Sequence, residues 1–111
     1  MDHVSLSQLG ADLLAQAREA ASQRAAHTIF GGQEHALRQT LIALAGGAGL
    51  AEHDSPGEAT LQVVAGRIRF RTDDDSLESA AGDLLTIPLQ RHAVDALQDS
   101  VLLLTVGKEP A

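Results

Sequence analysis

The sequence of 111 residues contains no cysteine, no tryptophan and no tyrosine, and its only phenylalanines are Phe30 and Phe70. Without cysteine the chain can form no disulfide and offers no thiolate as a nucleophile or metal ligand. Without tryptophan and tyrosine it lacks the usual stacking surface for sugars and for single-stranded nucleic acids. The interior of the protein is therefore expected to consist of aliphatic side chains.

Basic residues are also scarce, because 8 Lys and Arg face 15 Asp and Glu, and Lys108 is the only lysine. The formal net charge of −7 argues against a nucleic-acid partner, since phosphate binding needs a basic surface. No apolar segment approaches the roughly 18 residues of a membrane-spanning helix, so we expect no membrane association. Residues 1–8 lack a basic segment followed by an apolar run, which predicts a cytoplasmic protein without a signal peptide.

The segment from Ser5 to about Ser22 is predicted to form a helix. Leucine and alanine recur there at steps of three and four residues, which places them on one stripe. Ser5 and Gln8 have the spacing of a capping box, whereas Gly10 weakens the first half of the helix. Such a narrow, alanine-rich stripe must dock on something, either the body of its own subunit or a partner.

After Arg24 the apolar residues alternate with a period of two, which is typical of strands. The alternation is clearest at Arg67–Arg71, where Ile68 and Phe70 are expected to face inward. Asp73–Asp75 is predicted to be a solvated turn, because consecutive carboxylates on a turn do not converge on a metal. The expected strands are Ala26–Phe30, Leu37–Leu44, Leu61–Ala65, Arg67–Arg71, Leu77–Ala80, Leu84–Ile87, His92–Leu97 and Val101–Val106.

Short strands separated by turn residues, with no helix between them, predict an all-β sandwich or barrel. We therefore divide the chain into an N-terminal helical arm, residues 1–23, and a β-barrel domain, residues 24–111.

The glycines and prolines of the β region have a distinctive spacing. Gly47 is followed after five residues by His53, then by a turn at Ser55-Pro56-Gly57, an apolar strand and Gly66. This segment resembles the first sequence motif of the cupin superfamily.

A second segment matches the other cupin motif. Gly82 is followed after five residues by Pro88 and then by His92, and fifteen residues, 67–81, separate the two segments. The resemblance extends over about residues 37–106. It implies an all-β cupin jelly-roll barrel, a double-stranded β-helix like that of the RmlC-like proteins, preceded by the N-terminal α-helix.

The resemblance also implies where a metal would bind. Metal-binding cupins use two histidines separated by one residue, a glutamate four or five residues further on, and a histidine in the second motif. In this sequence His53 and His92 keep two of these places, whereas Ser55 and Ala59 occupy the other two. A catalytic metal generally needs three protein ligands, so the motif is degenerate.

Three routes to a third ligand remain open in the sequence. A local bulge could turn Glu58, next to Ala59, toward the interior. Gln62 could take the place if the strand register differs from the one expected. His35 or His27 could approach the mouth of the barrel.

Two functions follow as hypotheses. The first is a non-catalytic barrel that binds a small molecule around His53 and His92, or acts as a structural or regulatory partner. The second is a metal-dependent enzyme of the dioxygenase, isomerase or lyase type, with Fe, Mn, Ni or Zn, acting on a small organic metabolite. The sequence does not decide whether the protein is an enzyme. A homodimer is expected, because the resemblance suggests it and because the helix stripe and the strand Val101–Val106 need covering.

Overall fold

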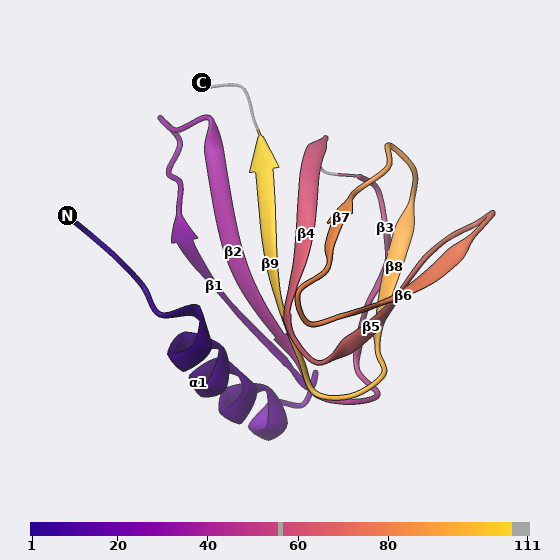
Figure 1. Cartoon of the computed structure of the whole chain (residues 1–111), viewed down its shortest axis with the longest axis horizontal. Coiled ribbons are helices and arrows are strands. Elements are labelled where there is room, and N and C mark those ends of the chain that lie inside the picture. The colour runs from indigo at the N-terminus through magenta and orange to yellow at the C-terminus, as the bar shows by residue number, and fades with distance from the viewer. Residues whose placement is uncertain (56, 108–111) are drawn as a thin grey trace.

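The structure is a computed structural model, and it describes residues 1–55 and 57–107. Pro56 of the expected turn and residues 108–111 of the expected β domain lie outside the described residues. Within the described part of the chain there are one helix and nine strands (Figure 1). In chain order these are α1 (Leu6–Glu19), β1 (Arg24–Phe30), β2 (Leu37–Leu44), β3 (Gly49–His53), β4 (Glu58–Ala65), β5 (Arg67–Thr72), β6 (Ser76–Ala80), β7 (Leu84–Thr86), β8 (His92–Ala96) and β9 (Ser100–Gly107).

The strands form two antiparallel sheets. One has five strands in the order β1-β2-β9-β4-β7, and the other has four in the order β3-β8-β5-β6. Figure 1 shows the larger sheet from β1 on the left to β7, and the smaller sheet on the right of the view. Neighbours such as β4 and β9 lie about forty residues apart in the chain, which is the connectivity of a jelly roll. The all-β jelly-roll prediction is confirmed.

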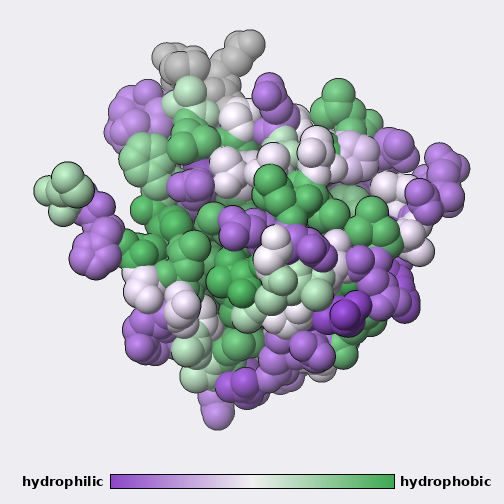
Figure 2. All heavy atoms as spheres, in the orientation of Figure 1, coloured by the Kyte–Doolittle hydropathy of each residue, from purple (hydrophilic) through white to green (hydrophobic). Residues whose placement is uncertain are grey.

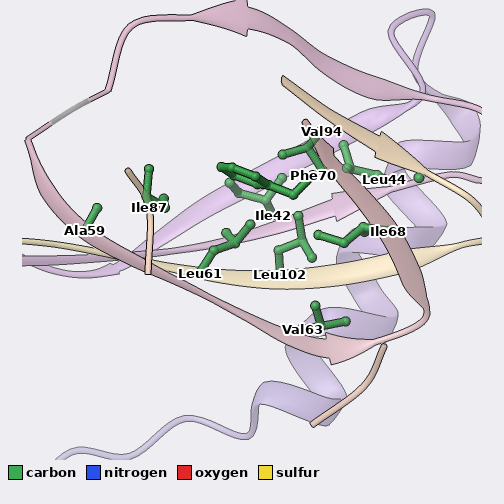
Figure 3. Packing of buried hydrophobic residues seen from close by; sticks show 11 residues of the cluster. Ile42, Leu44, Ala59, Leu61, Val63, Ile68, Phe70, Ile87, Val94 and Leu102 are labelled. Carbon is green, nitrogen blue, oxygen red and sulfur yellow. The ribbon is translucent and has the colours of Figure 1, made fainter. Parts of the chain in front are cut away.

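The main hydrophobic core lies between the two sheets. Side chains from every second residue of the strands meet there, with Leu61 and Leu102 from the larger sheet and Ile68, Phe70 and Val94 from the smaller one (Figure 3). Ile68 and Phe70 are buried, which confirms that they face inward. Aliphatic side chains fill this core apart from the single ring of Phe70.

A second core lies under the helix, on the outer face of the larger sheet. Leu13 and Ala17 of α1 are buried against side chains of β2 and β9, namely Leu41, Ala43, Val101 and Leu103. The helix stripe and the outer face of β9 therefore cover each other within one chain. This removes the argument that they need a second subunit to bury them.

The helix begins as expected but ends earlier. The hydroxyl of Ser5 accepts a hydrogen bond from the backbone N–H of Gln8 at 3.1 Å. The chain then leaves the helix at Ala20, whose backbone is extended, and turns through Gln23 into β1. Gly10 lies against Val101, so its missing side chain allows the helix to approach β9 closely.

Strand β3 was not among the expected strands. It has five residues and an irregular register against β8, so its side chains do not show the alternation that identifies a strand in sequence. Strand β4 begins at Glu58 rather than Leu61, because Glu58, Ala59 and Thr60 continue the pairing with β9.

The turn glycines have the expected backbone conformation. Gly66 and Gly82 have φ angles of 88° and 98°, a region that residues with side chains rarely adopt. A methyl group on Gly66 would overlap with the carbonyl oxygen of Asp99, because the β4–β5 turn packs directly on the start of β9. Among the described helices, none is long and apolar enough to cross a membrane.

Candidate functional site

His53 and His92 lie side by side on neighbouring strands. His53 ends β3, His92 begins β8, and the two residues are cross-strand partners. Their ring centroids are 4.3 Å apart and the rings meet edge to face at 66°. His92 is only 3% exposed and stacks on Phe70 with a centroid separation of 5.0 Å. The structure thus brings together the two histidines that the sequence singled out.

A bulge in β3 sets the direction of His53. Leu50 pairs with Val94 and His53 pairs with His92, so two residues of β3, Ala51 and Glu52, oppose a single residue of β8. Regular alternation would place residues 50 and 53 on opposite faces of the sheet. The extra residue places the His53 ring on the face where Leu50 contacts the main core.

Backbone carbonyl groups fix both rings. The Nδ1 atom of His53 lies 2.8 Å from the carbonyl oxygen of Ala51, and that of His92 lies 2.9 Å from the carbonyl oxygen of Gln90. A carbonyl oxygen only accepts, so each Nδ1 carries a hydrogen and the Nε2 atom is the other polar atom of each ring. Neither Nε2 has a hydrogen-bond partner among the described residues.

The charged neighbours of the histidines form an ion-pair cluster. The Arg91 guanidinium lies 2.8 Å from a Glu52 oxygen and 3.2 Å from an Asp54 oxygen. The hydrogen bond to Glu52 and the charge of Asp54 raise the pKa of Arg91. All three side chains are largely exposed, whereas His92 is buried. Arg91 is thus already neutralised by two carboxylates.

The residues around the pair do not fit a catalytic metal centre. The Ser55 hydroxyl is engaged in its own turn, donating to the Gly57 carbonyl at 3.1 Å. Ala59 is buried in the core and carries no ligand atom, while Glu58 is exposed. Among the described residues, no group of three or more His, Asp or Glu side chains is placed to hold a metal ion.

None of the described residues considered as a third ligand, namely Glu58, Gln62, His35 and His27, lies beside the histidine pair. The β4–β9 register is regular at Glu58 and shifts only between Val63 and Ala65, so no bulge re-aims Glu58. Gln62 is exposed, between the buried Leu61 and Val63 that face the core.

His35 and His27, the histidines of the third route, lie away from the pair. His35 follows β1, where its Nδ1 accepts the Gly32 N–H at 2.9 Å and its ring lies 4.8 Å from that of Phe30. His27 is exposed on β1, an edge strand of the larger sheet. Neither ring contacts His53 or His92 in the described part of the chain.

A cavity of about 270 Å³ lies next to His92. It opens between β6 at one edge of the smaller sheet and β7 at one edge of the larger sheet. Its lining residues are Phe70, Thr72, Asp75, Ser76, Leu77, Leu85, Thr86, Pro88 and Gln90.

Three of these residues connect the cavity to His92. Phe70 stacks on the His92 ring, Thr72 is its cross-strand partner, and the Gln90 carbonyl accepts from its Nδ1. The histidine rings themselves do not line the cavity. Sequence reasoning missed this cavity, because its walls come from strands that meet only in the folded chain. Asp75 was expected to be part of a solvated turn, and it also borders the cavity.

Comparisons with known proteins found no matching family model and no matching curated protein. Solved structures are similar in fold. A conserved protein of unknown function from Streptococcus pyogenes has a TM-score of 0.76 at 24% identity, covering 100% of this chain and 93% of that one. A cupin superfamily protein from Desulfitobacterium hafniense has a TM-score of 0.70 at 16% identity, covering 78% of each chain.

A third structure, an RmlC-like cupin from Desulfovibrio desulfuricans, has a TM-score of 0.66 at 22% identity, covering 76% of this chain and 81% of that one. At these identities the similarity concerns the fold. Together with the strand order and the two cupin-like segments, residues 47–66 and 82–92, it shows that this chain is a small domain with the cupin fold.

Proposed function

We propose that this protein is a non-catalytic cupin-fold barrel that binds a small molecule in the cavity beside His92. The observation that carries the proposal is the contact of Phe70, Thr72 and Gln90 with both the cavity and His92. A ligand in the cavity would therefore contact residues that themselves contact His92.

The lining has the composition of a ligand site. Apolar walls from Phe70, Leu77 and Leu85 are combined with hydroxyl groups and one amide, which is how small-molecule pockets obtain both affinity and orientation. Its volume is slightly below the range of roughly 300–1,000 Å³ that is common for ligand pockets, so the ligand is a small one.

The polar groups near the histidines support binding rather than catalysis. The Ser55 hydroxyl bonds to the Gly57 backbone and not to His53, so it lacks the adjacent base that activates a serine nucleophile. Arg91 is held by Glu52 and Asp54. What remains at the pair are two imidazole rings with no activated nucleophile beside them.

A matched pair of substitutions tests the proposal. Leu85 borders the cavity, whereas its neighbour Leu84 points to solvent and is 64% exposed. A fragment library is screened against the ¹⁵N-labelled protein by NMR. We expect shifts at the amides of Phe70, Thr72 and Leu77, which Leu85→Trp abolishes by filling the cavity and Leu84→Trp preserves. Shifts that survive Leu85→Trp, or that occur only elsewhere, would contradict the proposal.

The alternative is a metal-dependent enzyme, and one observation favours it. Both histidines keep Nδ1 on a backbone carbonyl, the arrangement that orients Nε2 toward a metal in many sites. Two imidazoles fall short of the usual three ligands, so we expect protein purified without chelators to contain no stoichiometric Fe, Mn, Ni or Zn. Stoichiometric metal that is lost in both His53→Ala and His92→Ala, as measured by elemental analysis, would favour the enzyme.

A further inference from the structure

We infer that the cavity beside His92 selects an organic cation, a small amine with an apolar body, and this inference rests on the proposed function. Asp75 is the only ionisable side chain among the described residues that line the cavity. None of the described arginines and histidines lines it. The charge that a ligand meets there is therefore negative.

The Asp75 carboxylate is held in place by the backbone and pairs with no counter-ion among the described residues. Its Oδ1 accepts the Ser76 N–H at 2.8 Å, and no described basic group lies within ion-pair distance of it. Arg71, on the adjoining strand β5, is bonded to Asp95 at 2.7 Å instead. One carboxylate oxygen thus remains for a ligand.

The turn that carries Asp75 is fixed by Thr72. The Thr72 N–H donates to the Asp75 carbonyl at 2.8 Å, and the Asp75 N–H donates to the Thr72 hydroxyl at 3.2 Å. Thr72 also lines the cavity and is the cross-strand partner of His92. The carboxylate is therefore attached to a backbone that the sheet holds at the rim of the cavity.

The remaining lining suits the apolar part of such a ligand. Phe70, Leu77, Leu85 and Pro88 give a wall without charge. An ammonium group at Asp75 would leave the body of the ligand against this wall. A carboxylate ligand would meet Asp75 with no described cation in the lining to compensate, and the net charge of −7 further raises the local concentration of cations over anions.

Three probes of the same size separate the alternatives. Benzylamine, benzyl alcohol and benzoate are titrated by NMR into the full chain at low salt, with binding followed at the amides of Phe70, Thr72 and Leu77. We expect benzylamine to bind about fivefold more tightly than benzyl alcohol, the upper end of what an exposed ion pair supplies. Benzoate is expected to bind most weakly.

Substitutions within one turn provide the control. Asp75→Asn should remove the preference for benzylamine, whereas Asp74→Asn, at a neighbouring residue that does not line the cavity, should retain it. Raising the salt concentration should reduce the preference in the wild type, because the ion pair is screened. This salt series tests the inference even if Asp75→Asn disturbs the turn.

Failure of the cation inference can be distinguished from failure of the proposed pocket. Equal binding of benzylamine and benzyl alcohol, tighter binding of benzoate, or a preference that persists in Asp75→Asn would overturn the inference of a cation and leave the proposed pocket intact. If none of the three probes binds and no library fragment binds either, both the pocket and its cation preference are wrong.

Discussion

Each histidine ring is held by the carbonyl group of the residue two positions before it, and this shared contact determines what the two rings can do. His53 donates to Ala51 and His92 donates to Gln90. The rings differ in their packing, because His92 is buried against Phe70 while His53 is exposed. His92 is thus packed against the core through Phe70, whereas His53 lies at the surface beside it.

This difference predicts unequal effects of substitution. His92→Ala should destabilise the protein by about 2–4 kcal/mol, since it leaves a cavity next to Phe70, comparable with the loss of a buried aromatic ring. His53→Ala should cost less than about 1 kcal/mol, as expected for an exposed side chain. Urea denaturation of both variants measures the two values. A larger loss for His53→Ala would contradict the packing described above.

Asp99 connects three segments through a single carboxylate. It accepts the Gly46 N–H at 2.8 Å and pairs with Arg18 of α1. The hydrogen bond from Gly46, followed by that from Arg18, lowers the pKa of Asp99. The charged form is therefore favoured in the folded protein.

The lowered pKa predicts how stability depends on pH. A carboxyl whose pKa is depressed by folding stabilises the protein above the pKa of the unfolded chain, about 3.9, and this contribution is lost as the pH falls through the folded value. Asp99→Asn should therefore cost up to about 1 kcal/mol at pH 7, in the range of exposed ion pairs, and progressively less as the pH falls through the lowered pKa of Asp99. Thermal denaturation across pH 2–7 checks this, with Asp73→Asn as control. A difference that is constant with pH would contradict it.

Among the structural elements, the β4–β5 turn depends most on a single glycine. Gly66 has a positive φ and also packs against Asp99 and Ser100, whereas Gly82 has a positive φ with open space around it. The two positions share backbone strain and differ in crowding.

These two glycines give a matched prediction. Gly82→Ala should cost about 1–2 kcal/mol, the penalty for placing a side chain at positive φ. Gly66→Ala should cost more, because the new methyl group also collides with the backbone of β9. Chemical denaturation of both variants compares them. Equal losses would mean that the β4–β5 turn moves away from β9 without penalty.

For the whole molecule, the open question is whether two chains associate. The helix and β9 cover each other within one chain, so they give no support to a dimer. Strand β1 nonetheless forms a sheet edge of seven residues, and exposed apolar side chains lie near it, including Phe30 and Leu37. Figure 2 shows apolar surface gathered over the side of the molecule where β1 and β2 lie.

We therefore expect a homodimer formed through the β1 edge, because a strand with one open edge and apolar neighbours favours pairing with another copy. Light scattering should give about twice the chain mass of 11.6 kDa. Phe30→Asp should yield monomers, while Leu84→Asp, on the edge strand at the other end of the same sheet, should not. A wild-type monomer at about 100 μM, well above the dissociation constant of a stable dimer, would contradict this expectation.

By itself the sequence determined the class of fold and identified His53 and His92 as the candidate site residues. Alternating apolar residues and turn glycines are local signals, since they reflect what a strand or a turn requires of its own residues. They predicted eight of the nine strands in the described part of the chain, the cupin-like order of motifs, and His53 and His92 as a pair. They also predicted that Glu58 faces away from the interior.

Only the tertiary structure decided how these parts meet. The bulge at Ala51 and Glu52 becomes visible only when β3 is paired with β8, about forty residues later, and it directs His53 to its partner. The docking of α1 on its own chain and the cavity between β6 and β7 likewise depend on contacts between distant segments. A local pattern cannot specify such contacts, because they arise from how the two sheets pack once all strands have found their neighbours.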